Sequence, residues 1–84
     1  MNNKIFSQRL NRELALLGFP DEMHQKINAV SKVFHVSKHL ANAMLFGNTI
    51  PSDAHLQRIA EILEVSPQWL TGSENRKNPD RTQH

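Results

Sequence analysis

The chain has 84 residues, which is enough for one domain with a modest hydrophobic core. It contains no cysteine, so it has neither a disulfide framework nor a thiolate metal site, as is usual in a reducing cytoplasm. Ten Lys and Arg against eight Asp and Glu leave a formal charge of +2, too small an excess to identify a partner. No apolar run approaches the roughly 18 residues of a membrane span. The first residues also lack the apolar core of a signal peptide. We therefore expect a cytoplasmic protein with no membrane contact.

The charges are unevenly distributed along the chain. Residues 23–52 contain no Asp or Glu, whereas the acids all lie outside this stretch. An acid-free, mildly basic stretch in an otherwise balanced domain is typical of a face that meets a polyanion, although chance in a short protein is the alternative. The basic and titratable side chains in this stretch are Lys26, Lys32, Lys38, His24, His35 and His39.

Residues 3–17 are predicted to form the first helix. Its apolar residues recur at helical spacing, and its charged residues are expected on the solvent side. Gly18 and Pro20 should end it. The expected apolar stripe is Phe6, Leu10, Leu14 and Leu17, and the expected surface residues are Lys4, Arg9, Arg12 and Glu13.

A second helix is predicted from about Asp21 to Phe34, with Asp21 and Glu22 at the end where the helix dipole favours negative charge. A third is predicted from Ser37 to Phe46. Only three or four residues connect the two helices, which is the length found in a helix-turn-helix.

The third helix is predicted to be amphipathic. Leu40, Ala41, Met44 and Leu45 fall on one side, and a polar set falls on the other. Ser37 is a natural N-cap and Gly47 a natural stop. A short helix with long polar side chains in front fits a DNA major groove, but it also describes many ordinary surface helices. The polar set consists of Lys38, His39 and Asn42, with Phe46 lower on the same side.

Two further helices follow. Pro51-Ser52-Asp53 begins the fourth, which continues to about Leu63 and has Ser52 as its expected cap. Ser66, also an expected cap, and Pro67 begin a single turn that Gly72 ends. Residues 73–84 contain no large apolar side chain and are predicted to be a disordered polar tail. The expected fold is therefore all-α, one compact domain of five helices over residues 3–72.

Residues 26–70 resemble the helix-turn-helix domain of phage repressors of the lambda repressor/Cro type. The resemblance rests on a series of offsets: Val30-Ser31, the turn His35-Val36-Ser37, Gly47, Pro51-Ser52, and the closing turn from Val65 to Leu70. It covers more than half of the chain, and the first helix suits the family as well. The resemblance implies a bacterial or phage-encoded DNA-binding transcriptional regulator, expected to be a repressor, with the third helix in the major groove and a homodimer on a two-fold operator.

The same resemblance implies individual roles. Base edges would be contacted from the exposed side of the third helix, and phosphates from its start, from the loop after it, and from backbone amides at the start of the second helix. The base-reading candidates are Lys38, His39, Asn42 and Ala43; the phosphate candidates are Lys26, Ser37, Asn48 and Thr49; the dimer candidates are Phe46, Trp69 and Leu70. For Trp69 the alternative is a role in the core of the monomer.

The chain also departs from the family pattern. His35 stands at the turn position where the family prefers glycine, so a non-glycine residue would adopt left-handed geometry there. Ala43 stands where many relatives carry a polar base-reading side chain. The family often pairs a Glu near position 45 with an Arg on the first helix, and Leu45 cannot form that pair.

Two other functions are weighed against DNA binding. The histidines His24, His35, His39 and His55 could suggest a metal site, but few carboxylates accompany them, and metal sites usually need three or more convergent ligands. The same fold could serve as an antitoxin-type module that holds a toxin or antirepressor protein. No catalytic motif is present, so we expect neither an enzyme nor a cofactor.

Overall fold

The structure, a computed structural model, describes residues 3–75 and 77. This part of the chain forms five helices and no strand, which confirms the prediction of an all-α fold. The helices are α1 (Asn3–Leu16), α2 (Met23–Phe34), α3 (Lys38–Leu45), α4 (Asp53–Leu63) and α5 (Pro67–Leu70). None of the helices within the described ranges is both long enough and apolar enough to cross a membrane.

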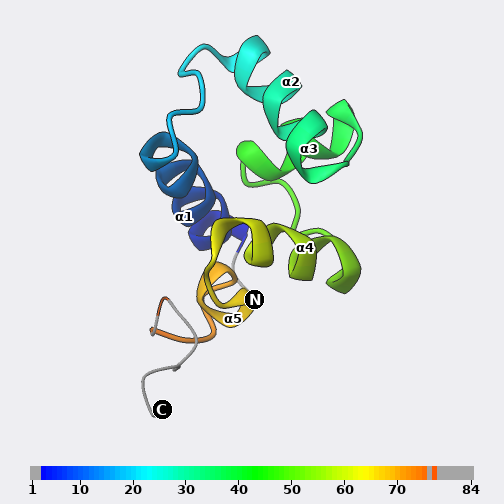
Figure 1. The fold of residues 1–84 in the computed structure, drawn as a ribbon. Helices are drawn as coiled ribbons and strands as arrows, with labels where there is room; N and C mark the ends of the chain where they lie inside the picture. Colours follow the sequence, from blue (N-terminus) through cyan, green and yellow to red (C-terminus); the bar gives the residue numbers. More distant parts are fainter. Residues whose placement is uncertain (1–2, 76, 78–84) are drawn as a thin grey trace.

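Each helix packs on two others, and α1 packs on α3 and α5. Figure 1 shows α2 and α3 side by side, and α5 beside the beginning of α1. The C-terminal end of α3 also packs on α1, and α4 contacts both α2 and α5. Helix α1 contacts both helices over the same stretch of its length: Ser7 and Asn11 bond the end of α3, and Arg9 bonds α5.

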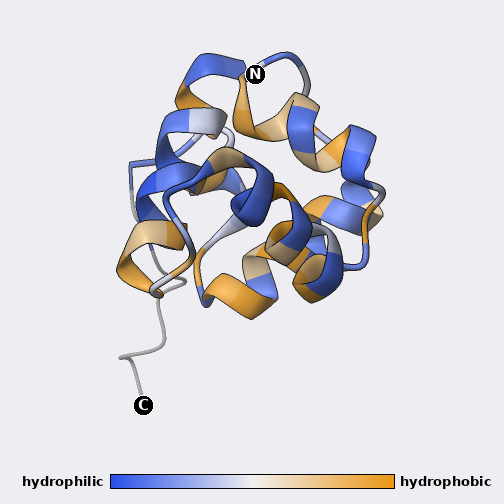
Figure 2. Ribbon diagram, turned by 90° about the horizontal axis from the view of Figure 1, so that it is seen from above, coloured by the Kyte–Doolittle hydropathy of each residue, from blue (hydrophilic) through white to orange (hydrophobic). Residues whose placement is uncertain are grey.

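All five helices contribute apolar side chains to one core. Each long helix carries both hydrophilic and hydrophobic residues, as Figure 2 shows, and the hydrophobic ones gather inside. Complete burial of one such large side chain stabilises the fold by roughly 1.5–3 kcal/mol. The largest fully buried side chains are Phe6, Leu10, Leu14, Val30, Phe34, Met44, Ile59 and Leu70.

Two of the helices end on a left-handed residue that is not glycine. His35 follows α2 with φ 58° and ψ 49°, and Glu64 follows α4 with φ 60° and ψ 44°. In each case the next amide reaches back five residues, from Val36 to the Ser31 carbonyl and from Val65 to the Ala60 carbonyl. The prediction that His35 adopts left-handed geometry is thus confirmed, and the chain uses the same device a second time.

Serine begins the next helix in both places. The Ser37 hydroxyl accepts a bond from the Leu40 amide at 3.0 Å, and the Ser66 hydroxyl accepts one from the Trp69 amide at 3.1 Å. These bonds confirm two of the three predicted caps, Ser37 and Ser66. The cap bond expected from Ser52 at the start of α4 is not formed, and its hydroxyl instead lies 3.3 Å from Nδ1 of His55.

The end of α3 also follows the prediction. Gly47 adopts a positive φ of 78°, and the amide of Asn48 bonds the Ala43 carbonyl at 2.9 Å. This is the glycine-dependent ending that closes many helices.

Some expectations for α1 and α2 were wrong. Leu17 lies outside α1 and is 56% exposed, since the helix stops at Leu16 and the chain turns away at Gly18. Glu13, expected on the surface, is buried. Helix α2 starts at Met23 rather than Asp21, because Glu22 occupies the N-cap position with extended backbone.

Residues 73, 74 and 77 of the predicted tail make backbone hydrogen bonds to α5 and to its cap. The amides of Ser73 and Glu74 bond the Gln68 carbonyl, and the Lys77 carbonyl accepts a bond of 2.8 Å from the Ser66 amide. The chain therefore continues to pack on α5 beyond the predicted boundary at residue 72. Residues 76 and 78–84 of the predicted tail lie outside the described residues.

Candidate nucleic-acid interface

Helix α3 has one buried side and one exposed side. Ala41, Met44 and Leu45 are buried in the core, and Leu40 is half-buried. Lys38, His39 and Asn42 are exposed. The predicted amphipathic division of this helix therefore matches its burial.

The C-terminal end of α3 is fixed to α1 through a single carbonyl oxygen. The Leu45 carbonyl accepts a bond from the Ser7 hydroxyl at 2.7 Å and another from the Asn11 side-chain amide at 3.1 Å. Lys26 of α2 donates to Oδ1 of Asn11 at 3.1 Å. This network joins α1, α2 and α3 and holds the exposed side of α3 in a fixed orientation.

The N-terminal end of α3 is fixed to α2. The Ser31 hydroxyl donates to the Val36 carbonyl at 2.6 Å, and the Val36 side chain is buried in the core. The small Ser31 side chain thus bonds the turn directly. With both ends held, α3 can present its polar side chains without the entropic cost of ordering the helix on binding.

The expected base-reading residues lie together on this helix. Lys38, His39 and Asn42 share the exposed side, and Ala43 is half-buried next to them. A lysine ammonium and an asparagine amide are suited to the hydrogen-bonding edges of guanine and adenine. No carboxylate occurs between residues 22 and 53, so neither α3 nor the turns that flank it carry a negative side chain.

The expected phosphate contacts are only partly available. Ser37 and Asn48 are exposed, although the Ser37 hydroxyl already caps α3. The Thr49 hydroxyl donates to the Ile50 carbonyl at 3.3 Å. Lys26 is half-buried, and its ammonium is used in the bond to Asn11. Its structural role was missed because it depends on Asn11, 15 residues earlier in the chain.

The start of α2 is not an open anion site. The Glu22 carboxylate accepts bonds from the amides of His24 at 3.2 Å and Gln25 at 2.9 Å. These two backbone bonds, that of Gln25 first, lower the pKa of Glu22 below its ordinary value. Since the Glu22 carboxylate occupies the amides of His24 and Gln25, these two amides do not face a phosphate as expected.

The dimer candidates divide into two groups. Phe46 is 57% exposed at the end of α3. Trp69 and Leu70 are buried within the chain, so they offer a second copy little or no surface. For Trp69 the monomer-core alternative is the observed one.

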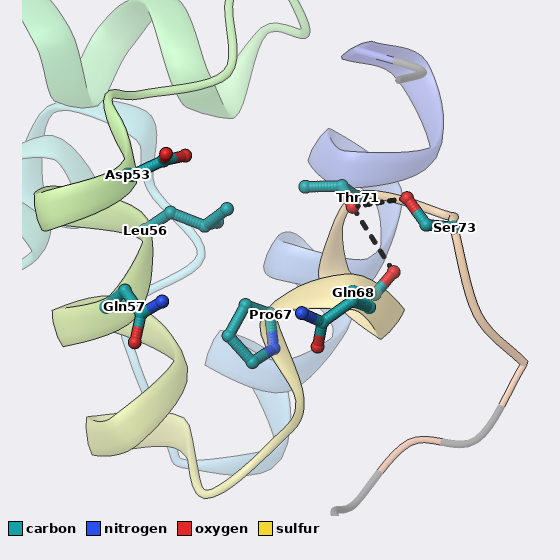
Figure 3. A pocket seen from close by; sticks show the side chains of 7 residues that line it. All are labelled: Asp53, Leu56, Gln57, Pro67, Gln68, Thr71 and Ser73. Carbon is teal, nitrogen blue, oxygen red and sulfur yellow. Dashed lines mark hydrogen bonds between the residues drawn. The ribbon is translucent and has the colours of Figure 1, made fainter.

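Outside α3, the described part of the chain has a surface groove but no cluster of metal ligands. No three His, Cys, Asp or Glu side chains in it lie close enough together to hold a metal ion. An open groove of about 270 Å³ lies between α4 and the α5 region, with Asp53, Leu56 and Gln57 facing Pro67, Gln68, Thr71 and Ser73 across it (Figure 3). No residue of α3 lines this groove, so it is separate from the exposed side of α3.

Comparisons of the chain with models of protein families, with curated proteins and with solved structures found no match.

Proposed function

We propose that the protein is a sequence-specific DNA-binding transcriptional regulator that places α3 in the major groove. The observation that carries this proposal is the exposed polar side of α3, with Lys38, His39 and Asn42 on a helix whose two ends are fixed to α1 and α2. A rigid helix with donors and acceptors on its free side is what reading of base edges requires.

The fold and the motif spacing support the same proposal. The α2–α3 pair with its three-residue connection has the length of a helix-turn-helix, and the sequence offsets resemble the lambda repressor/Cro family. The acid-free residues 23–52 would keep repulsion from phosphates low. Within this proposal the five helices form a lambda-repressor-like domain, and the protein acts as a repressor.

The proposal includes a second copy of the chain. One domain of this size makes few base contacts, and a dimer on two half-sites about 10 base pairs apart would double them. Phe46 is the remaining candidate for this contact because it is exposed at the end of α3. A Phe46→Ala variant should bind each half-site with unchanged selectivity and lose cooperativity between half-sites.

Binding to a pool of short DNA duplexes at several salt concentrations tests the proposal. We expect affinity to fall steeply as salt rises, since phosphate contacts release counterions, and we expect selected duplexes to share a two-fold motif. Lys38→Ala should weaken binding, while Lys32→Ala, which removes an exposed lysine from α2, serves as the matched control. Absence of salt-dependent binding to any duplex would contradict the proposal.

A further inference from the structure

A buried carboxylate lies in α1 outside the candidate interface. The Glu13 side chain is only 8% exposed. Among the described residues its buried Oε2 atom has one close polar partner, the Lys77 ammonium, at 2.9 Å. Burial of a carboxylate is costly unless a cation or several donors compensate it. Glu13 therefore creates a position where a positive group is strongly favoured.

An indole ring forms a second wall of that position. The Lys77 nitrogen lies 5.7 Å from the centroid of the Trp69 ring, within the range of a cation–π interaction. Trp69 is itself buried. One ammonium group thus interacts with a carboxylate and with an aromatic ring, both of them largely shielded from water.

The neighbouring cation, Arg9, shares the Trp69 ring with Lys77 but does not pair with the carboxylate. Its guanidinium donates to the carbonyls of Trp69 and Glu74 and lies 4.8 Å from the Trp69 ring centroid. Arg9 therefore holds the backbone around the ring, and Lys77 is the cation that pairs with Glu13.

Lys77 is held in place by a short segment, which we call the strap (residues 73–75 and 77). The strap is bonded at both ends, from the amides of Ser73 and Glu74 to the Gln68 carbonyl and from the Ser66 amide to the Lys77 carbonyl. The Lys77 side chain is nevertheless 44% exposed. The walls of the site are thus buried, while the group that fills it remains open to solvent.

We propose that Glu13 and Trp69 form a receptor site for a primary alkylammonium group, which this chain fills with its own Lys77. When Lys77 is removed, the same site accepts the ammonium of another lysine side chain. A primary ammonium fits because its compact head approaches the carboxylate and donates to it, whereas a quaternary ammonium has no N–H group and a larger radius. The site is independent of DNA binding, and its test involves no DNA.

The chain contains one tryptophan, so its fluorescence reports on this site alone. In Lys77→Ala we expect the emission of Trp69 to shift to longer wavelength and its quenching by acrylamide to increase. Added n-propylammonium, the part of the side chain that the substitution deletes, should reverse both changes. Tetramethylammonium or sodium at the same concentration should not. As a control, Lys32→Ala, which removes an exposed lysine from α2, should leave the emission of Trp69 unchanged.

A second variant tests whether the Glu13 carboxylate is what binds n-propylammonium. In the double variant Glu13→Gln with Lys77→Ala, the amide keeps the size of the side chain but not its charge, so n-propylammonium should no longer reverse the shift. Equal reversal by sodium, or reversal that persists with Glu13→Gln, would overturn the proposal.

A measurement on the unmodified protein covers the case in which Lys77→Ala fails to fold. Acetylation of each lysine by a water-soluble reagent, followed by mass spectrometry, should show slower modification of Lys77 than of the exposed Lys32. Glu13→Gln should abolish this protection. Equal rates in the unmodified protein would overturn the proposal.

Discussion

The α2–α3 and α4–α5 pairs are connected by the same type of turn, but the second helix of each pair exposes different side chains. Residues 35–37 and 64–66 each consist of a left-handed residue, a buried valine and a capping serine, with matching backbone hydrogen bonds. Yet α3 exposes a polar side, whereas α5 is a single turn with both of its apolar residues buried.

The two pairs also differ in the chain that follows the second helix. After α3 the chain ends the helix at Gly47 and moves on to α4. After α5 it bonds back onto Gln68 and Ser66 through the strap, with Lys77 above Trp69. Local sequence thus specifies the turn, and long-range packing specifies whether the second helix remains available to a partner.

Among the stability predictions, replacement of the two capping serines should change the free energy of unfolding most. Ser66→Ala should lower the free energy of unfolding by about 2 kcal/mol, because Ser66 is buried and the Trp69 amide would lose its partner away from water. Ser37→Ala should cost about 1 kcal/mol, because water can replace an exposed cap. Urea unfolding measures both, and an equal or larger loss at Ser37 would contradict this account of the two turns.

Replacement of the two left-handed residues should change the free energy of unfolding by a smaller amount. Replacement of either His35 or Glu64 by glycine should raise the free energy of unfolding by roughly 0.5–1 kcal/mol, since relief of the left-handed strain exceeds the added entropy of the unfolded chain. Because the two backbone conformations are nearly identical, we expect similar gains in urea unfolding. A loss at either position would show that its side chain stabilises the turn by a contact that outweighs the strain.

The smallest expected effect is on the pH dependence of stability, through Glu22 at the start of α2. The pKa of Glu22 is lowered in the folded state by the bonds from Gln25 and His24, so the charged carboxylate favours folding. This contribution is complete above the pKa of Glu22 in the unfolded chain and is lost as pH falls through the lower folded pKa. In Glu22→Gln, stability should therefore change less over this acidic range. Melting temperatures across that range measure this, and an unchanged pH profile would contradict it.

The sequence was sufficient for features that depend on near neighbours. The helices follow from apolar spacing, the caps from Ser37 and Ser66, and the end of α3 from Gly47. The division of α3 into buried and exposed sides was also predicted, because it requires only a regular helix with one apolar stripe.

The sequence was insufficient where distant segments meet. Glu13 was expected on the surface because it is charged, but the strap brings Lys77, which is distant in the sequence, over it. Lys26 was expected to contact phosphate, but Asn11 of α1 accepts its bond. Neither contact follows from local periodicity, and both change which charges are available to a partner.

The most direct test of the central proposal concerns Asn42, which is exposed on α3. The affinity of the Asn42→Ala variant is measured for the selected duplex and for duplexes that each differ from it at one base pair. The control is Asn28→Ala, which removes an exposed asparagine from α2. We predict that Asn42→Ala loses roughly 1–3 kcal/mol of discrimination at one base pair and keeps its stability toward urea. Asn28→Ala should retain the full pattern of preferences. Unchanged discrimination at every base pair in Asn42→Ala would contradict the claim that the exposed side of α3 reads DNA.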